Sequence, residues 1–229
     1  MSSNPPDIIR NFERVPAHIV AQAAQFQPAI LADVAGRRGA MHGRIKALRP
    51  RMKLAGPAFT VEVRPGDNLM IHAAIAMARP GDVLVIDGKG DQGSALMGTI
   101  MMTACQKLGI AGVVMDGACR DSLEIDEMNY PVFCVGTNPN GPTKNIAGRI
   151  GHPVSVGDVT VRAGDFVIAD GDGVVVVERE KIEALLPAAA RKVSDEAARI
   201  AAIKEGDTAA KWLNGALRTA GVLKEGEVL

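Results

Sequence analysis

An arginine and an aspartate stand side by side at the end of the segment Asp116-Gly-Ala-Cys-Arg-Asp121, just after the apolar run 112–115. A planar guanidinium can bind a carboxylate through two hydrogen bonds, and a carboxylate can hold a hard divalent cation. In an open α/β sheet, ligands bind at the carboxyl ends of the strands. Arg120 and Asp121 are therefore candidates for binding an anionic substrate and a metal ion. The spacing equally allows Asp121 to be the N-cap of the next helix, with Arg120 in a surface ion pair.

A second candidate is the segment Gly98-Thr-Ile-Met101, within a predicted helical region. The first N–H groups of a helix have no partner inside it and can bind a carboxylate. Gly98 could equally be a glycine that allows close packing.

A third candidate is the segment Gly88–Gly93, which matches the pattern G-x-G-x-x-G between a predicted strand and a predicted helix. Glycines of this pattern let the backbone approach a pyrophosphate, and Asp116 ends the next predicted strand, as in dinucleotide sites. Lys89 and Asp91 are unusual between such glycines. A glycine-rich strand-to-helix loop is the favoured interpretation; a dinucleotide site or another anion-binding loop stays open.

Histidine and cysteine patterns support no metal or nucleophile site. The four histidines occur without an H-x-H or H-E-x-x-H pattern, and His72 is expected to be structural. The three cysteines contain no C-x-x-C pair, so neither a zinc ribbon nor a disulfide framework is indicated. Cys119 has no visible partner base. We expect a reducing, cytoplasmic compartment.

Apolar runs and helical patterns alternate in the middle of the chain and predict βαβ units with a parallel sheet. The predicted strands are 55–63, 83–86, 112–115 and 131–135, and the predicted helices are 68–78, 95–108 and 121–129.

The flanking segments differ in character from this centre. The sequence predicts N-terminal helices over 16–26 and 28–34, a loop over 136–151, hairpin-like strands over 153–177, a long helix over 179–204 and a last helix over 208–219. We predict a single α/β domain over 1–229, with a core of about 15–205 and a C-terminal helical extension over 206–229.

Composition excludes several classes of protein. The chain has 229 residues, 47% apolar and 23% charged, which is typical of globular proteins and not of disordered chains. Lys and Arg balance Asp and Glu at 26 each, so no global field attracts nucleic acid or an anionic membrane. Aromatic residues make up only 3%, which argues against base-stacking surfaces. The polar start and the absence of an apolar run of about 18 residues predict neither a leader nor a membrane span.

The segments GPAFTVEV, PGDNLMIHAA, PGDVLVIDG and GIAGVVMDGACRD, with the helix at Gly98, together resemble the RraA-like family. This family includes the class II 4-hydroxy-4-methyl-2-oxoglutarate / 4-carboxy-4-hydroxy-2-oxoadipate aldolases. The resemblance covers about residues 15–205. Its most specific part is a G-x-x-[LM] helix start paired with a DGAxRD strand end, here with Gly98 and Arg120 separated by 22 positions. It implies a swivelling β/β/α domain that assembles as a homotrimer or homohexamer.

The resemblance also implies roles for individual residues. The backbone of the G-x-x-[LM] segment would bind the carboxylate of pyruvate, the arginine would bind the keto acid and stabilise its enolate, and the aspartate would ligate Mg²⁺ or Mn²⁺. A glutamate on the long helix of a neighbouring subunit would hold metal-bound water. These roles fall on Gly98, Thr99, Ile100 and Met101; on Arg120; on Asp121; and on Glu196.

The implied activity is cleavage of 4-hydroxy-2-oxo dicarboxylic or tricarboxylic acids to pyruvate and a second oxo acid, with decarboxylation of oxaloacetate as a side activity. No Schiff-base lysine is required. One residue departs from the aldolase pattern: Thr99 stands where an acidic residue helps to place a proton-transferring water. Other family members regulate ribonuclease activity by binding a protein, which is the alternative function here.

Overall fold

The computed structural model describes residues 7–229, so the first six residues of the polar start lie outside the described part. The chain divides into two compact units, one that ends at Ala190 and one that spans Arg191–Leu229. The boundary falls inside a helix and not near residue 206, where the predicted extension begins. That the whole chain acts as one domain stays a prediction.

Within the described part, the first unit is built on a nine-stranded mixed sheet with the order β1-β5-β4-β3-β2-β10-β11. Strand β6 pairs with β4, β7 pairs with β2, and β8 and β9 form a separate antiparallel pair. The strands are β1 (Lys46–Ala47), β2 (Leu54–Glu62), β3 (Val83–Met97), β4 (Gly112–Cys119), β5 (Val132–Cys134), β6 (Gly136–Thr137), β7 (Arg149–Ile150), β8 (Val154–Val156), β9 (Val159–Val161), β10 (Phe166–Asp170) and β11 (Gly173–Val177).

The centre of this sheet is parallel. Leu84 of β3 lies opposite Phe59 of β2 and Val113 of β4, and Val113 in turn lies opposite Val132 of β5. These pairings confirm the predicted parallel sheet. The additional strands β1, β7, β10 and β11 join it in antiparallel fashion.

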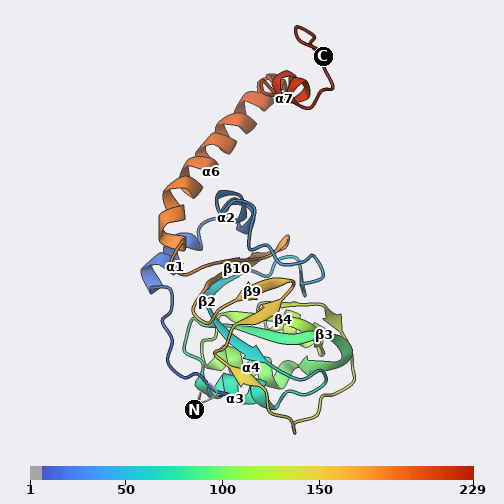
Figure 1. The fold of residues 1–229 in the computed structure, drawn as a ribbon. Helices are drawn as coiled ribbons and strands as arrows, with labels where there is room; N and C mark the ends of the chain where they lie inside the picture. The colour runs from blue at the N-terminus through green and yellow to red at the C-terminus, as the bar shows by residue number, and fades with distance from the viewer. Residues whose placement is uncertain (1–6) are drawn as a thin grey trace, which may run out of the picture. The chain divides into compact units, whose positions relative to one another are not determined.

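Helices of the first unit lie on two sides of its sheet. Figure 1 shows α1 and α2 on one side of strands β2 and β10, and α3 and α4 on the other. The helices are α1 (Ala17–Ala23), α2 (Pro28–Val34), α3 (Leu69–Met77), α4 (Thr99–Lys107), α5 (Ser122–Glu127), α6 (Ile182–Lys204) and α7 (Leu213–Thr219). The α/β class, the N-terminal helices and the long C-terminal helix are therefore confirmed.

Two apolar clusters hold this arrangement together, and strand β10 contributes to both. Phe166 and Ile168 pack with residues of α1 and α2, whereas Val167 and Ala169 belong to the larger cluster on the other face. Successive side chains of a strand point to opposite faces, so one apolar run supplies both clusters. The strand ends that carry the candidate residues are thus held in a packed framework.

The segment Gly88–Gly93 is not a strand-to-helix loop, because β3 continues through it to Met97. Asp91 lies opposite Gly117 and Ala95 lies opposite Ala118, with shifts of register between these pairs. Strand bulges of this kind insert extra residues without ending the ladder. The predicted helix over 95–108 accordingly begins only at Thr99.

Other predicted boundaries shift for related reasons. Strand β4 runs to Cys119, four residues further than predicted, because the continued β3 gives it a partner. The predicted loop over 136–151 contains the short strands β6 and β7, and the two last helices begin a few residues later than predicted. Among residues 7–229, no helix has both the length and the hydropathy needed to cross a bilayer.

Candidate functional site

The start of helix α4 faces the end of strand β4. The N–H of Thr99 donates to Asp121 Oδ2 at 2.9 Å, and the N–H groups of Met101 and Met102 donate to the Gly98 carbonyl at 3.1 Å each. The N–H of Ile100 has no acceptor among the described residues. This helix start therefore offers a donor, and the positive end of the helix dipole, to an anion.

Asp121 occupies the N-cap position of α5, but its side chain makes no capping bond to that helix. The carboxylate binds the start of α4 instead. The backbone of Asp121 is left-handed, with φ at 61°, a conformation that Asp tolerates better than most residues. The N-cap alternative is thus right about the position and wrong about the interaction.

Arg120 is free to meet a ligand. Its Nε lies 3.7 Å from Asp121 Oδ2, a loose pair in which both side chains are more than a third exposed. A surface pair of this kind contributes little to stability. The guanidinium therefore has N–H groups available for a carboxylate or an enolate oxygen.

Gly98 is required by the closeness of these groups. A Cβ at this position would meet Asp121 Oδ2 below any ordinary contact distance, and would lie 2.9 Å from Arg120 Cγ. Its φ of −145° is open to any residue, so space alone demands the glycine. Gly98 therefore stands at the start of helix α4 and also allows Arg120 and Asp121 to pack closely against it.

These residues line one pocket, with a volume of about 110 Å³. Gly98, Ile100, Met101, Arg120 and Asp121 are all part of its wall. The structure thus brings together five of the residues that the sequence singles out. Thr99 joins them through its N–H bond to Asp121, and its hydroxyl is buried with no partner among the described residues.

Asn68 is a wall residue that sequence reasoning missed. It is buried, and its Nδ2 donates to the Leu96 carbonyl at 2.8 Å. Its Oδ1 is also buried but has no partner among residues 7–229. Buried acceptors are rarely left unsatisfied, so this oxygen is available to a water or a ligand in the pocket. Its place at a helix start after Pro65-Gly-Asp was the available signal.

His72 and Lys144 also line the pocket. His72 follows Asn68 by one helical turn and so shares its face. That His72 is structural stays a prediction. Burial lowers the pKa of His72, and the nearby Lys144 ammonium lowers it further. The pocket wall therefore contains two basic side chains, Lys144 and Arg120, and one acidic side chain, Asp121. This balance favours an anionic ligand.

A second, more open hollow of about 330 Å³ also borders this ion pair. Ser122, Thr137 and Asn138 line it together with Arg120 and Asp121. Arg120 and Asp121 thus line two hollows, and only the first of them also contains Lys144.

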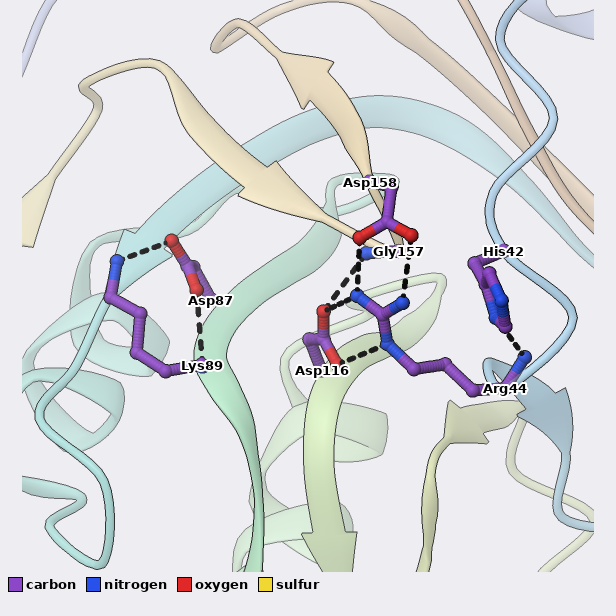
Figure 2. Close-up of polar contacts among 7 residues, drawn as sticks. All are labelled: His42, Arg44, Asp87, Lys89, Asp116, Gly157 and Asp158. Carbon is purple, nitrogen blue, oxygen red and sulfur yellow. Dashed lines mark hydrogen bonds and ion pairs between the residues drawn. The ribbon is translucent and has the colours of Figure 1, made fainter.

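Asp116, the acid that the dinucleotide interpretation requires, already makes hydrogen bonds inside the protein. Figure 2 shows Arg44 between two carboxylates: its guanidinium lies 2.9 Å from Asp116 Oδ2 and 2.8 Å from Asp158 Oδ1. The N–H of Gly157 donates to Asp116 as well, at 3.0 Å. Hydrogen bonds to Asp158 and to Asp116 raise the pKa of Arg44. Because the glycine-rich segment lies inside a strand and Asp116 is held in this network, the dinucleotide interpretation is wrong.

Lys89 is likewise held by acids. Its Nζ lies 2.6 Å from Asp87 Oδ2 and 3.0 Å from Glu62 Oε1, and Figure 2 shows the first of these contacts. Burial by itself would lower the pKa of Lys89, but the two carboxylates outweigh it and raise the pKa. A protonated amine of this kind is not a nucleophile.

Cys119 is buried behind Arg120, with its Sγ 3.7 Å from that of Cys134. The contact with Cys134 and burial raise the pKa of Cys119, which makes it a poor nucleophile. In the described part of the chain, no three His, Cys, Asp or Glu side chains gather into a metal-binding group.

Glu196 lies on α6 in the unit Arg191–Leu229, where its carboxylate pairs with Lys192 at 3.0 Å. Its predicted role belongs to a neighbouring subunit and stays a prediction.

Comparison with known proteins shows the family of this chain. The profile of the RraA-like family, described as Aldolase/RraA, matches residues 19–176. A protein of Halalkalibacterium halodurans named "Putative 4-hydroxy-4-methyl-2-oxoglutarate aldolase" is 42% identical over 70% of this chain and 77% of its own length. An Arabidopsis thaliana protein named "Putative 4-hydroxy-4-methyl-2-oxoglutarate aldolase 3" is 33% identical over 61% of this chain and 87% of its own length.

A solved structure shares the fold. Streptomyces coelicolor RraAS2, described as an unusual member of the RNase ES inhibitor RraA protein family, superposes with a TM-score of 0.76 at 28% identity. The match covers 82% of this chain and 99% of that protein.

Proposed function

This chain belongs to the RraA-like family, and we propose that it is a lyase that cleaves 4-hydroxy-2-oxo dicarboxylic or tricarboxylic acids to pyruvate and a second oxo acid. The 4-hydroxy-4-methyl-2-oxoglutarate type is the expected substrate class. The observation that carries the proposal is the meeting of the α4 start, Arg120 and Asp121 in one cationic pocket. Oxaloacetate would be decarboxylated by the same site, because that reaction also passes through the enolate of pyruvate.

The donor set at Asp121 fits Mg²⁺ or Mn²⁺. Mg²⁺ keeps several of its waters and is commonly held by only one or two carboxylates, so the absence of a larger acidic group in the described part is no obstacle. The side chain of Asp121 is 35% exposed, and Asn68 in the same pocket wall has an Oδ1 without a partner among the described residues. When bound, the cation supplies a Lewis acid for the 2-oxo oxygen.

The residues of this chain bind and orient the substrate. The Ile100 N–H and the dipole of α4 bind the carboxylate next to the 2-oxo group. Arg120 donates to the oxygen that becomes negative as the C3–C4 bond breaks. A fixed donor aimed at developing charge contributes about 10²–10³ in rate.

Proton transfer is where this chain departs from the aldolases that it resembles. Cleavage requires loss of the C4 hydroxyl proton and later protonation of the enolate carbon. The unpaired Thr99 hydroxyl is suited to hold the water that carries these protons. A hydroxyl is a weaker base than a carboxylate, so we expect slower turnover than with an acidic residue there.

We further propose that the chain works as a cytoplasmic homotrimer or homohexamer, in which Glu196 of a neighbouring subunit holds water near the metal. The partner is a small 2-oxo acid, and neither nucleic acid nor a membrane is involved.

A second candidate function is binding of a ribonuclease as a regulator, with a vestigial pocket. The likeness to Streptomyces coelicolor RraAS2 favours it, since that protein is described within an RNase ES inhibitor family. The intact Arg120–Asp121 pair favours the lyase, because a protein-binding regulator has no need of it.

Pyruvate release, coupled to lactate dehydrogenase, separates the two. With 4-hydroxy-4-methyl-2-oxoglutarate and Mg²⁺, Arg120→Ala should lose turnover by at least about 10² while keeping its fold. The control is Arg191→Ala, since Arg191 is 85% exposed and pairs only loosely with Asp195. Equal rates for Arg120→Ala and the wild type would reject the lyase proposal.

A further inference from the structure

Lys144 reaches the pocket from a long loop between β6 and β7, and its own side chain is exposed. A flexible loop would not hold an ammonium group in one place, because ordering each residue has an entropic cost. Something must therefore fix the backbone on both sides of Lys144.

The carboxylate of Asp67 does this. Asp67 is 1% exposed, and its Oδ2 accepts a hydrogen bond from the Thr143 hydroxyl at 2.7 Å and another from the Asn145 N–H at 2.7 Å. Its Oδ1 accepts the N–H of Leu69 at 3.0 Å, at the start of α3. One buried side chain thus ties both neighbours of Lys144 to the helix start beside Asn68.

The backbone reinforces the same connection. The N–H of Thr143 donates to the Gly66 carbonyl at 2.7 Å, and the N–H of Asn68 donates to the Thr143 carbonyl at 3.0 Å. Asn68 is itself a wall residue of the pocket, so the loop and the wall are fixed as one piece.

The other half of the loop is held by the glycine-rich segment. The side-chain amide of Asn138 donates to the Gln92 carbonyl at 2.6 Å, and that of Asn140 donates to the Gly93 carbonyl at 3.1 Å. The continued strand β3 therefore anchors the first half of the loop and Asp67 anchors the second.

The ionised state of Asp67 suits this task. Burial by itself would raise the pKa of Asp67, but the hydrogen bonds from the loop and from Leu69 lower it to about 2. A charged acceptor makes stronger hydrogen bonds than a neutral one. Asp67 is buried and makes its hydrogen bonds inside the protein, so it acts on a ligand only through the residues that it holds.

We propose that Asp67 is a positioning residue that fixes Lys144 at the pocket, where the ammonium binds the second carboxylate of a 2-oxo dicarboxylate. This rests on the proposed function in one respect, the identity of the ligand. The α4 start and Arg120 are taken up by the first carboxylate and the oxo oxygen. Lys144 is then the remaining fixed cation of the pocket wall.

The loop is tested first, without reference to activity. Asp67→Asn replaces an acceptor oxygen by an NH₂ donor among the N–H and O–H donors that now bind the carboxylate. Limited trypsin digestion of the full chain should cut between Lys144 and Asn145 about tenfold faster in this variant, since cleavage follows local opening. The matched control is Asp165→Asn, another buried carboxylate that accepts two backbone N–H groups, those of Arg162 and Arg179. Equal cutting at Lys144 in Asp67→Asn and Asp165→Asn would overturn the proposal.

Kinetics then test the ligand. With 4-hydroxy-4-methyl-2-oxoglutarate, Asp67→Asn should raise KM about tenfold with little change in kcat, the sign of lost uniform binding. With 4-hydroxy-2-oxobutanoate, which lacks the second carboxylate, KM should not respond. In a Lys144→Ala background, Asp67→Asn should add nothing to KM. Full additivity, or an equal effect on both substrates, would show a general structural role and overturn the inference.

The two proposals fail differently. A wild-type chain without turnover contradicts the lyase, while the trypsin comparison still decides whether Asp67 holds Lys144 in place.

Discussion

Replacing Gly98 by alanine adds a single methyl group to the candidate site. The backbone angle of Gly98 suits alanine, so no conformational strain is introduced. The new Cβ would lie 2.9 Å from Arg120 Cγ and 3.1 Å from Arg120 Nε, where ordinary contact begins at 3.4 Å. The Arg120 side chain must therefore retreat by about half an ångström, and the Asp121 carboxylate must move further.

The expected loss follows from that displacement. A misplacement of about 1 Å can cost about 10² in rate, and overpacking costs about 1–3 kcal/mol in stability. We expect Gly98→Ala to lower kcat/KM for 4-hydroxy-4-methyl-2-oxoglutarate by about 10-fold to 100-fold, and to remain folded. Initial rates of pyruvate release measure the first, and thermal unfolding followed by circular dichroism measures the second.

Gly43→Ala is the matched control, because an added Cβ there meets only the end of a lysine side chain at 3.9 Å. It should leave kcat/KM unchanged. Wild-type kcat/KM in folded Gly98→Ala would refute the reasoning, since it would mean that the positions of Arg120 and Asp121 do not matter to the reaction.

Three further expectations concern single groups. Thr99→Val removes a buried, unpaired hydroxyl, so it should raise the free energy of unfolding by about 1 kcal/mol, as thermal melts would show. The same change should slow pyruvate release about tenfold. Unchanged turnover would show that Thr99 takes no part in proton transfer. The stability that Asp67 contributes is present above the ordinary carboxyl pKa of 3.8 and is lost as the pH falls toward its lowered value of about 2. The melting difference between wild type and Asp67→Asn should therefore shrink across that interval, and a constant difference would speak against an ionised Asp67. Cys105, Cys119 and Cys134 are buried, and burial raises the pKa of Cys105 to about 12, so iodoacetamide should label them only on unfolding, as mass spectrometry would show.

Much of the frame of the site was predictable because it depends on local patterns. Continuous apolar runs and helical spacing fixed the parallel strands, and the adjacency of Arg120 and Asp121 to a strand end placed them at the ligand-binding edge. The pairing of the helix start at Gly98 with this strand end was expected only from the resemblance to the RraA-like family.

Other parts depend on pairing between distant segments, which local patterns do not contain. The glycine-rich segment Gly88–Gly93 continues a strand because β4 offers a partner alongside it. Lys144 enters the pocket because Asp67, 77 residues earlier in the chain, holds the neighbours of that lysine. Asn68 could be placed at a helix start, but only the fold shows that its Oδ1 is left unpaired in the wall.

The central claim is that the Arg120–Asp121 pocket cleaves a 2-oxo acid with the help of a divalent cation. Its most direct test is the rate of pyruvate release from 4-hydroxy-4-methyl-2-oxoglutarate by the wild-type chain and by Asp121→Asn, with Mg²⁺ and with EDTA. We expect wild-type turnover that EDTA abolishes and Mg²⁺ restores, and none from Asp121→Asn in either condition. Wild-type release no faster than the blank with Mg²⁺ alone, or release that EDTA leaves unchanged, would contradict it.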